Sequence, residues 1–219
     1  MLKVTITKEE LAELETESFS GKIYVINSIS KARKAISYLK KCDFLGFDTE
    51  TRPSFQKGVL RKMALMQLST HDECFLFRIN KIGIPDCLKE LIEDDSVVKI
   101  GLSLKDDFGV LRRSAQSGTI PDSFVELQSL VKTYGISDIS LQKIYGILFD
   151  KRISKSQRLS NWEAQELTSA QQEYAAIDAW ACLKIYDYLL GGNFNYQTSK
   201  YLKNIEEEKI NTNKENETL

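Results

Sequence analysis

The sequence has 219 residues, 42% of them hydrophobic, which is enough to bury the core of one α/β domain. Its 30 basic and 31 acidic residues give a net charge of −1, which argues against a protein that binds nucleic acid passively through a strong overall positive charge. There is no apolar run long enough to span a bilayer and no secretory signal, so we expect a cytoplasmic protein with no membrane partner.

In the first half of the chain, the residue patterns predict several strands between helices. The predicted elements are, in order, a short helix opened by the capping box Thr7–Glu10, a strand over 22–26, a helix over 30–41, strands over 44–47, 63–68 and 74–77, a helix over 85–92 and a strand over 97–100. Three strands joined by short turns and followed by helix–strand–helix alternation predict an α/β fold, with a mixed central sheet flanked by helices.

Helical patterns dominate the second half of the chain, apart from one candidate strand at 124–127. The strongest pattern spans 169–190 and ends at a pair of glycines. Residues 203–219 contain almost no apolar side chains, which predicts a disordered polar tail. We therefore expect a single domain over 1–202, with an N-terminal extension over 1–21.

The few cysteines and the single histidine limit the kinds of site that the chain can contain. The cysteines are scattered without a C-x-x-C pair or zinc-type spacing, so we expect reduced, mostly buried thiols. His71 lies in a polar turn, where we expect it to be solvated. One histidine excludes a His-rich zinc site and argues against a histidine general base.

The first pattern with chemical consequences is Asp48-Thr49-Glu50, directly after the apolar strand over 44–47. Residues two apart on a strand point to the same face, so Asp48 and Glu50 bring two like charges together. Taken alone, the pattern is more typical of a solvated strand end than of a site. The strand has the character of a central one, however, and aspartate is depleted in strands. A bound metal ion would resolve this conflict.

The second pattern lies where a predicted strand runs into a helix. Ser103 is expected to cap this helix with Asp106 as its partner, which accounts for Asp106. Asp107 lies on the apolar stripe of the helix, three residues after Leu104 and four before Leu111. Capping leaves Asp107 unexplained, although a solvated carboxylate in the first helical turn is an equally good interpretation of this residue by itself.

The third pattern is Tyr174-Ala175-Ala176-Ile177-Asp178, within the helix predicted over 169–190. A spacing of four places Tyr174 and Asp178 on one face of the helix, one turn apart. That face continues with apolar residues, so Asp178 lies on a stripe that faces the core. A buried carboxylate needs a cation or a strong hydrogen-bond donor. An ordinary half-buried tyrosine would account for Tyr174 alone.

In this order and spacing, the three patterns resemble the exonuclease motifs of the DEDDy 3′→5′ exonucleases, the superfamily of ribonuclease D and of the exonuclease domain of the Werner syndrome helicase. The connecting segments are similar too: Lys62–Ser69 resembles the second strand of the family, and Leu159–Trp162 with Leu167-Thr168 resembles the stretch before the third motif. The resemblance covers approximately residues 22–190. It implies a ribonuclease H-like fold and hydrolysis of DNA or RNA from the 3′ end, with release of nucleoside 5′-monophosphates.

The resemblance also implies roles for five catalytic residues. Two ions of Mg²⁺ or Mn²⁺ would be held by carboxylates, the oxygen ligands that hard cations prefer. The four metal ligands would be Asp48, Glu50, Asp107 and Asp178, with Asp48 bridging both ions. Tyr174 would orient the attacking water, because a tyrosine with an ordinary pKa near ~10 is not a base at neutral pH.

Contacts with the nucleic acid are predicted from rings and charges near these motifs. Phe55, which follows the first motif, would stack on the terminal base, with a solvated charged loop as the alternative. Lys155 and Arg158 would face the substrate, because the family has substrate-facing residues in this stretch. Trp162 is interpreted as a packing residue.

Two other functions stay open at this point. One is a catalytically silent module that binds nucleic acid, and the complete set of five residues argues against it. The other is a two-metal hydrolase of free nucleotides. The sequence identifies no protein partner.

Overall fold

The computed structural model describes residues 2–53, 62–115 and 123–204, and its centre is a six-stranded sheet. The strand order is β3-β6-β5-β4-β7-β8, formed by β3 (Lys22–Ile26), β4 (Phe44–Thr51), β5 (Met63–Ser69), β6 (Glu73–Phe77), β7 (Val98–Gly101) and β8 (Phe124–Glu126). β5 runs antiparallel to both of its neighbours, and the other pairs are parallel. The mixed central sheet predicted from the sequence is confirmed.

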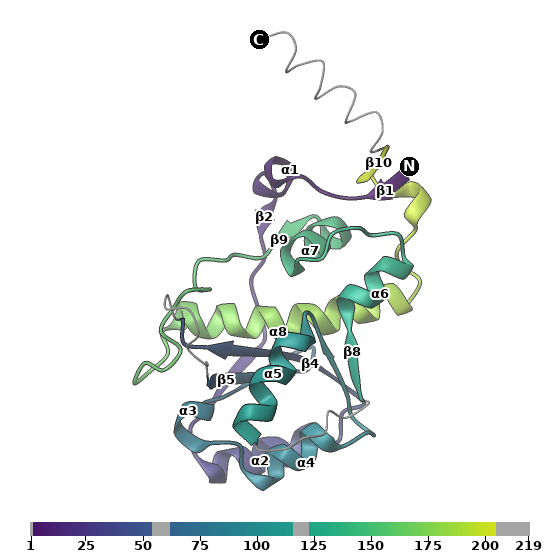
Figure 1. The fold of residues 1–219 in the computed structure, drawn as a ribbon. Helices are drawn as coiled ribbons and strands as arrows, with labels where there is room; N and C mark the ends of the chain where they lie inside the picture. Colours follow the sequence, from purple (N-terminus) through teal and green to yellow (C-terminus); the bar gives the residue numbers. More distant parts are fainter. Residues whose placement is uncertain (1, 54–61, 116–122, 205–219) are drawn as a thin grey trace.

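Helices cover both faces of the sheet (Figure 1). α8 (Ser169–Leu190) crosses one face, in contact with the strands from β3 to β7, and packs against α6 and α7 on its outer side. The remaining helices are α1 (Lys8–Ala12), α2 (Ile29–Leu39), α3 (Ile79–Ile82), α4 (Asp86–Glu93), α5 (Leu104–Ala115), α6 (Leu127–Thr133) and α7 (Leu141–Phe149). Those on the opposite face are α2, α4 and α5. No helix among the described residues has both the length and the apolar character needed to cross a bilayer.

Successive side chains of β4 point to opposite faces of the central sheet. Leu45 and Phe47 are fully buried in the core shared with α2, α4 and α5. Gly46 points the other way and lies against α8. Asp48 and Glu50 continue the Gly46 series, so the strand directs both carboxylates to the face that α8 covers.

Short strands outside the central sheet pair segments that are far apart in the sequence. β1 (Leu2–Val4) pairs antiparallel with β10 (Leu202–Asn204), and β2 (Glu15–Thr16) pairs parallel with β9 (Lys151–Arg152). The prediction of a disordered tail from residue 203 is therefore wrong for Lys203 and Asn204, because the partner strand that orders them lies at the other end of the sequence. The rest of that predicted tail lies outside the described residues.

Hydrogen bonds between polar side chains link Glu17, in the segment before β3, to α7, β9 and α8. The carboxylate of Glu17 accepts hydrogen bonds from the Tyr145 hydroxyl (2.6 Å) and from Lys151 Nζ (3.0 Å). Lys184 of α8 donates to the Tyr145 hydroxyl (2.7 Å) and lies over three aromatic rings, 4.5–5.2 Å from their centroids. These contacts pack the residues that precede β3 against the body of the fold.

The start of α5 is capped differently from the prediction. Ser103 has a left-handed backbone (φ 64°), and its N–H and that of Leu104 donate to the Glu126 carboxylate at 3.0 and 2.8 Å. The Ser103 hydroxyl accepts a hydrogen bond from Gln128 Nε2 (2.8 Å). The carboxylate of Glu126, on the neighbouring strand, thus accepts hydrogen bonds from the free N–H groups at this helix end. This cap replaces the predicted capping pair of Ser103 and Asp106.

α8 approaches β4 very closely at Gly46. A Cβ atom at this position would lie 2.0 Å from the carbonyl oxygen of Ala179 and 3.3 Å from Cβ of Leu183. The absence of a side chain lets the helix backbone rest on the strand backbone.

Replacing Gly46 with alanine should destabilise the protein, because the added methyl group has no room unless the backbone of α8 moves. We expect Gly46→Ala to lower the free energy of unfolding by about 3 kcal/mol, at the upper end for overpacking. Chemical denaturation measures this loss. Gly101→Ala is the matched control: its nearest neighbour would be Cδ2 of Leu104 (2.5 Å), the end of a side chain that can rotate, so it should lose less. Equal stability of Gly46→Ala and wild type would contradict the close approach.

Candidate active site

Asp48 and Glu50 lie near the end of β4, on the face that α8 covers. Their partners across the β4–β5 register are Gln67 and Leu65, respectively. The register shifts between Glu50 and Thr51, directly after the two carboxylates. Such irregularities are common next to active sites, because they redirect side chains and end strand pairing.

Tyr174 and Asp178 come from the first turns of α8. The helix starts at a capping box in which the Thr168 hydroxyl accepts from the Gln171 N–H (3.2 Å) and the Gln171 side-chain oxygen accepts from the Thr168 N–H (3.0 Å). The spacing of four residues then places Tyr174 and Asp178 one turn apart on one face. The small residues beside them, Ala175 and Ala179 among others, are fully buried and let this face approach the sheet.

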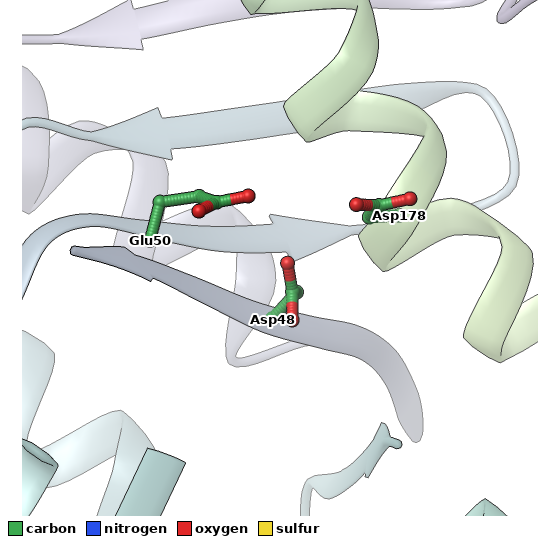
Figure 2. Close-up of side chains that lie close together, drawn as sticks. All are labelled: Asp48, Glu50 and Asp178. Atoms are coloured by element: carbon green, nitrogen blue, oxygen red, sulfur yellow. The ribbon is translucent and has the colours of Figure 1, made fainter. Parts of the chain in front are cut away.

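Three of the four predicted metal ligands meet between β4 and α8. One carboxylate oxygen from each of Asp48, Glu50 and Asp178 lies within 4.8 Å of the other two. Figure 2 shows the three side chains directed into a common space, with Asp48 and Glu50 extending from the strand toward the helix. All three are partly buried. We refer to Asp48, Glu50 and Asp178 as the carboxylate cluster.

Asp107 reaches the end of β4 from the opposite face of the sheet. Thr49, between the two strand carboxylates, points away from α8, and its hydroxyl donates a hydrogen bond to Oδ1 of Asp107. Asp107 is buried, with 9% of its surface exposed, and lies outside the group of three oxygens. Its charge still raises the pKa of Asp48. The sequence pattern did not predict Thr49 as a partner of Asp107, and the position of Thr49 between two carboxylates was the available signal.

Burial raises the pKa of every carboxylate here, and the charges of neighbouring carboxylates add to this effect at Asp48 and Glu50. Burial, then the charges of Asp107, Asp178 and Glu50, raises the pKa of Asp48 well above its ordinary value. Burial and the charges of Asp178 and Asp107 raise the pKa of Glu50 to about 9. Burial raises the pKa of Asp178 to about 7 and that of Asp107 to about 6. Without a cation, the site therefore retains protons at neutral pH.

A divalent cation fits this set of ligands. Carboxylate oxygens are the ligands that hard cations such as Mg²⁺ and Mn²⁺ prefer. Within the described ranges, no Lys or Arg nitrogen lies within 4.0 Å of an oxygen of the carboxylate cluster. Described side chains thus form no close ion pair with the cluster, and a cation would supply the missing positive charge.

Tyr174 lies between the carboxylate cluster and a buried tryptophan. Burial, followed by the charges of the cluster, raises the pKa of Tyr174. Trp162 is fully buried, and its ring centroid lies 5.8 Å from that of Tyr174, which confirms the packing interpretation of Trp162. The segment that carries Trp162 is held in place by Arg78, whose guanidinium donates to the carbonyl oxygen of Ala164.

Two of the three predicted substrate contacts lie close enough to the cluster to affect its charges. Lys155 and Arg158 are exposed residues of the loop between β9 and α8. The charge of Lys155 acts to lower the pKa of Asp178, and that of Arg158 acts to lower the pKa of Glu50. Phe55 lies outside the described residues.

His71 lies in the turn between β5 and β6, away from the carboxylate cluster. Its side chain is exposed, as expected, and pairs with Asp187 at 3.1 Å. Asp187 lies nine residues after Asp178, which is about 13 Å along the helix axis. The single histidine is therefore placed to stabilise the surface of α8 and does not reach the site.

Comparison with known proteins relates most of the chain to exonucleases. A family model described as 3'-5' exonuclease matches residues 23–191. An Arabidopsis thaliana protein named 3'-5' exonuclease is 32% identical over 78% of this chain and 64% of its own length. The mouse bifunctional 3'-5' exonuclease/ATP-dependent helicase WRN is 33% identical over 77% of this chain and 12% of its own length. The chain thus spans less than two thirds of either of these relatives.

Solved structures share the fold. The Aedes aegypti Nibbler EXO domain has a TM-score of 0.69 at 21% identity, covering 80% of this chain and 92% of that one. Escherichia coli RNase D has a TM-score of 0.69 at 22% identity, covering 77% and 44%. Trypanosoma brucei RNase D, solved in complex with RNA U12, has a TM-score of 0.67 at 19% identity, covering 79% and 64%. These likenesses confirm the expected ribonuclease H-like fold.

The raised carboxylate pKa values predict that the cation-free protein loses stability as the pH rises. Carboxylates that hold protons in the folded state release them near pH ~4 when unfolded, so stability is greatest at low pH and falls as the pH passes through about 6 and about 7, the folded values for Asp107 and Asp178. In EDTA, we expect a lower thermal midpoint at pH 8 than at pH 5. The corresponding loss in the free energy of unfolding is on the order of a few kcal/mol, and solvent screening at the partly exposed groups reduces it. The scan stops at pH 8 because buried Lys99, its pKa lowered to about 8, acts in the opposite sense above that value.

Asp178→Asn removes one of these groups and should flatten the pH profile. Asp86→Asn, at an exposed position on α4, is the matched control and should leave the profile unchanged. A wild-type midpoint that stays constant from pH 5 to pH 8 would contradict the raised pKa values, and so would an Asp178→Asn profile as steep as that of wild type.

Proposed function

The chain belongs to the 3′-5′ exonuclease family, and on this premise we propose that it removes nucleotides successively from the 3′ end of a DNA or RNA strand and releases nucleoside 5′-monophosphates. The observation that carries the proposal is the carboxylate cluster, whose oxygens come from a strand and a distant helix and lie within 4.8 Å of one another. Like charges held this close, without a close ion pair to a cationic side chain of the described residues, are costly unless a bound cation neutralises them.

Two divalent ions, Mg²⁺ or Mn²⁺, complete the proposed site. Asp48, Glu50 and Asp178 would hold them, with Asp107 as the fourth carboxylate. Bound there, such ions would neutralise charge on the scissile phosphate and make water a better nucleophile. The described residues offer no comparable set of His and Cys ligands, which supports hard cations over zinc.

In this proposal, Tyr174 orients the attacking water and does not deprotonate it. Its raised pKa keeps the phenol protonated, so the hydroxyl is available as a hydrogen-bond partner and not as a base. Packing against buried Trp162 limits the movement of its ring. Orientation of a reacting group contributes to the rate without a change in charge.

Lys155 and Arg158 would guide the phosphate backbone toward the cluster. Both are exposed, and both act on the pKa of a cluster member, so their positive charges lie at the edge of the site. Basic side chains there reduce the repulsion between an acidic site and a polyanion.

Digestion of a labelled oligonucleotide tests the reaction. With Mg²⁺ or Mn²⁺, a 5′-labelled strand should shorten progressively from its 3′ end, and EDTA should abolish the reaction. Asp48→Asn should retain less than about a tenth of the wild-type rate, a loss above ~1.4 kcal/mol in transition-state stabilisation. Matched DNA and RNA, as single strands and as duplexes with recessed 3′ ends, identify the preferred polymer.

Several outcomes would contradict this function. Early release of the 5′ label as a mononucleotide would reverse the polarity, and full activity in EDTA would exclude the cation. Binding of the oligonucleotide without hydrolysis would indicate a catalytically silent module. Hydrolysis of free nucleotides alone would indicate a nucleotide hydrolase.

Tyr174→Phe tests the role of the tyrosine hydroxyl. The change removes one oxygen and little volume, so the thermal midpoint and Mn²⁺ binding should persist while turnover falls by about 10²-fold, the scale of a mispositioned reacting group. Single-turnover digestion measures this loss. His71→Ala, on the exposed turn, should keep turnover close to wild type. Loss of turnover in His71→Ala together with wild-type turnover in Tyr174→Phe would refute the assignment.

A further inference from the structure

β5 carries a buried amide that has no hydrogen-bond partner within the described part of the chain. The side chain of Gln67 is fully buried, and neither its Nε2 nor its Oε1 forms a hydrogen bond there. The residues that precede it on the strand, from Met63 to Met66, are all apolar. A buried amide loses its hydrogen bonds to water on folding, so an unpartnered one opposes folding.

Other buried polar side chains of the sheet do find partners. Lys99 Nζ donates to Ser123 Oγ (2.6 Å) and to the carbonyl oxygen of Asp94 (2.9 Å). The Ser69 hydroxyl, two residues after Gln67, donates to the carbonyl oxygen of Thr70 (2.8 Å). Elsewhere among the described residues, Arg78 and Trp162 each leave one buried nitrogen unpartnered, whereas Gln67 leaves both of its polar atoms so. The lack of partners at Gln67 is therefore unusual in this fold and needs a reason.

Gln67 lies beside Asp48. The two residues are direct partners in the β4–β5 register, so their side chains leave the sheet on the same face, with Cβ atoms about 5 Å apart. α8 covers this face with the buried thiol of Cys182, whose pKa is raised by burial and then by the charges of Asp48 and Asp178. A carboxamide without partners among the described residues and a carboxylate of the cluster thus lie side by side under α8.

We propose that Gln67 is a positioning residue for the cation site, and that its Nε2 donates a hydrogen bond to the carboxylate of Asp48 when Asp48 holds a divalent ion. The inference rests on the proposed function, because it requires Asp48 to be a ligand. A carboxylate that gives one oxygen to a cation can still accept a hydrogen bond on the other. Groups that hold a ligand in this way fix its orientation and strengthen cation binding.

This role explains why an amide stands in an otherwise apolar stretch of strand. A hydrophobic side chain would fill the same space and stabilise the fold without leaving polar atoms unpartnered. The unpartnered amide therefore destabilises the cation-free protein, and the lost stability is recovered when the cation binds. Residues of this kind, which break a local rule of folding without a compensating structural contact, are expected at functional sites.

Gln67→Met tests the proposal, because methionine has the same unbranched length and no hydrogen-bonding head group. Titration calorimetry of the full chain with Mn²⁺ alone measures the affinity, and thermal unfolding in EDTA measures the fold. We expect the variant to bind Mn²⁺ about tenfold more weakly than wild type. In EDTA it should unfold at the same temperature as wild type or at a higher one. Met66→Leu, one residue earlier and on the opposite face, is the matched control and should keep the wild-type affinity.

Unchanged Mn²⁺ affinity in Gln67→Met overturns the proposal, whatever its unfolding temperature. Weaker affinity together with a lower unfolding temperature in EDTA also overturns it, because a loss of packing would explain both. If Gln67→Met does not fold, Gln67→Leu takes its place under the same criteria. Failure of the proposed function itself is distinguishable, because wild type would then neither bind Mn²⁺ nor shorten an oligonucleotide.

Discussion

The packing of α8 directly on β4 fixes the distance between the two halves of the site. A Cβ atom at Gly46 would lie 2.0 Å from the carbonyl oxygen of Ala179, so backbone rests on backbone at this point. Asp48 lies two residues after Gly46, and Asp178 immediately precedes Ala179. One rigid contact therefore sets the spacing of carboxylates that would otherwise move apart, since like charges at a few ångströms repel strongly away from bulk water.

Apolar packing around α8 supplies the stability that this repulsion opposes. The helix lies between the sheet and the helices α6 and α7, and residues such as Leu183, Ile185 and Leu189 are almost fully buried in the core that they share. Each such side chain contributes about 1.5–3 kcal/mol on burial. A few of them outweigh repulsion on the order of a few kcal/mol, which protons on the carboxylates or a cation between them reduce further. The fold can therefore hold the cluster together before any ion arrives.

The sequence predicted the parts of the site that depend on local periodicity. The alternation along β4 and the helical stripe through Asp178 follow from spacing alone, which placed the carboxylates of each element on one face, and the family resemblance then selected them as candidate ligands. Contacts between distant residues could not be predicted in this way. The bond from Thr49 to Asp107 joins β4 to α5, 58 residues apart in the sequence. The cap of α5 uses Glu126 from a neighbouring strand in place of the local partner expected at Ser103. Both depend on strand order, which spacing does not reveal.

In the proposed function, the charge of the site would allow a chain with a net charge of −1 to act on a polyanion. Four ionised carboxylates would repel phosphate, yet the raised pKa values of Glu50, Asp107 and Asp178 show that they are not all ionised at neutral pH without a cation. Protons and divalent ions compete for the same oxygens, because a carboxylate must lose its proton to act as a ligand. Rising pH would therefore favour a bound cation, which would reverse the local field, and the positive charges of Lys155 and Arg158 would add to it. Under this proposal, attraction of nucleic acid depends on an occupied site and not on the overall charge of the protein.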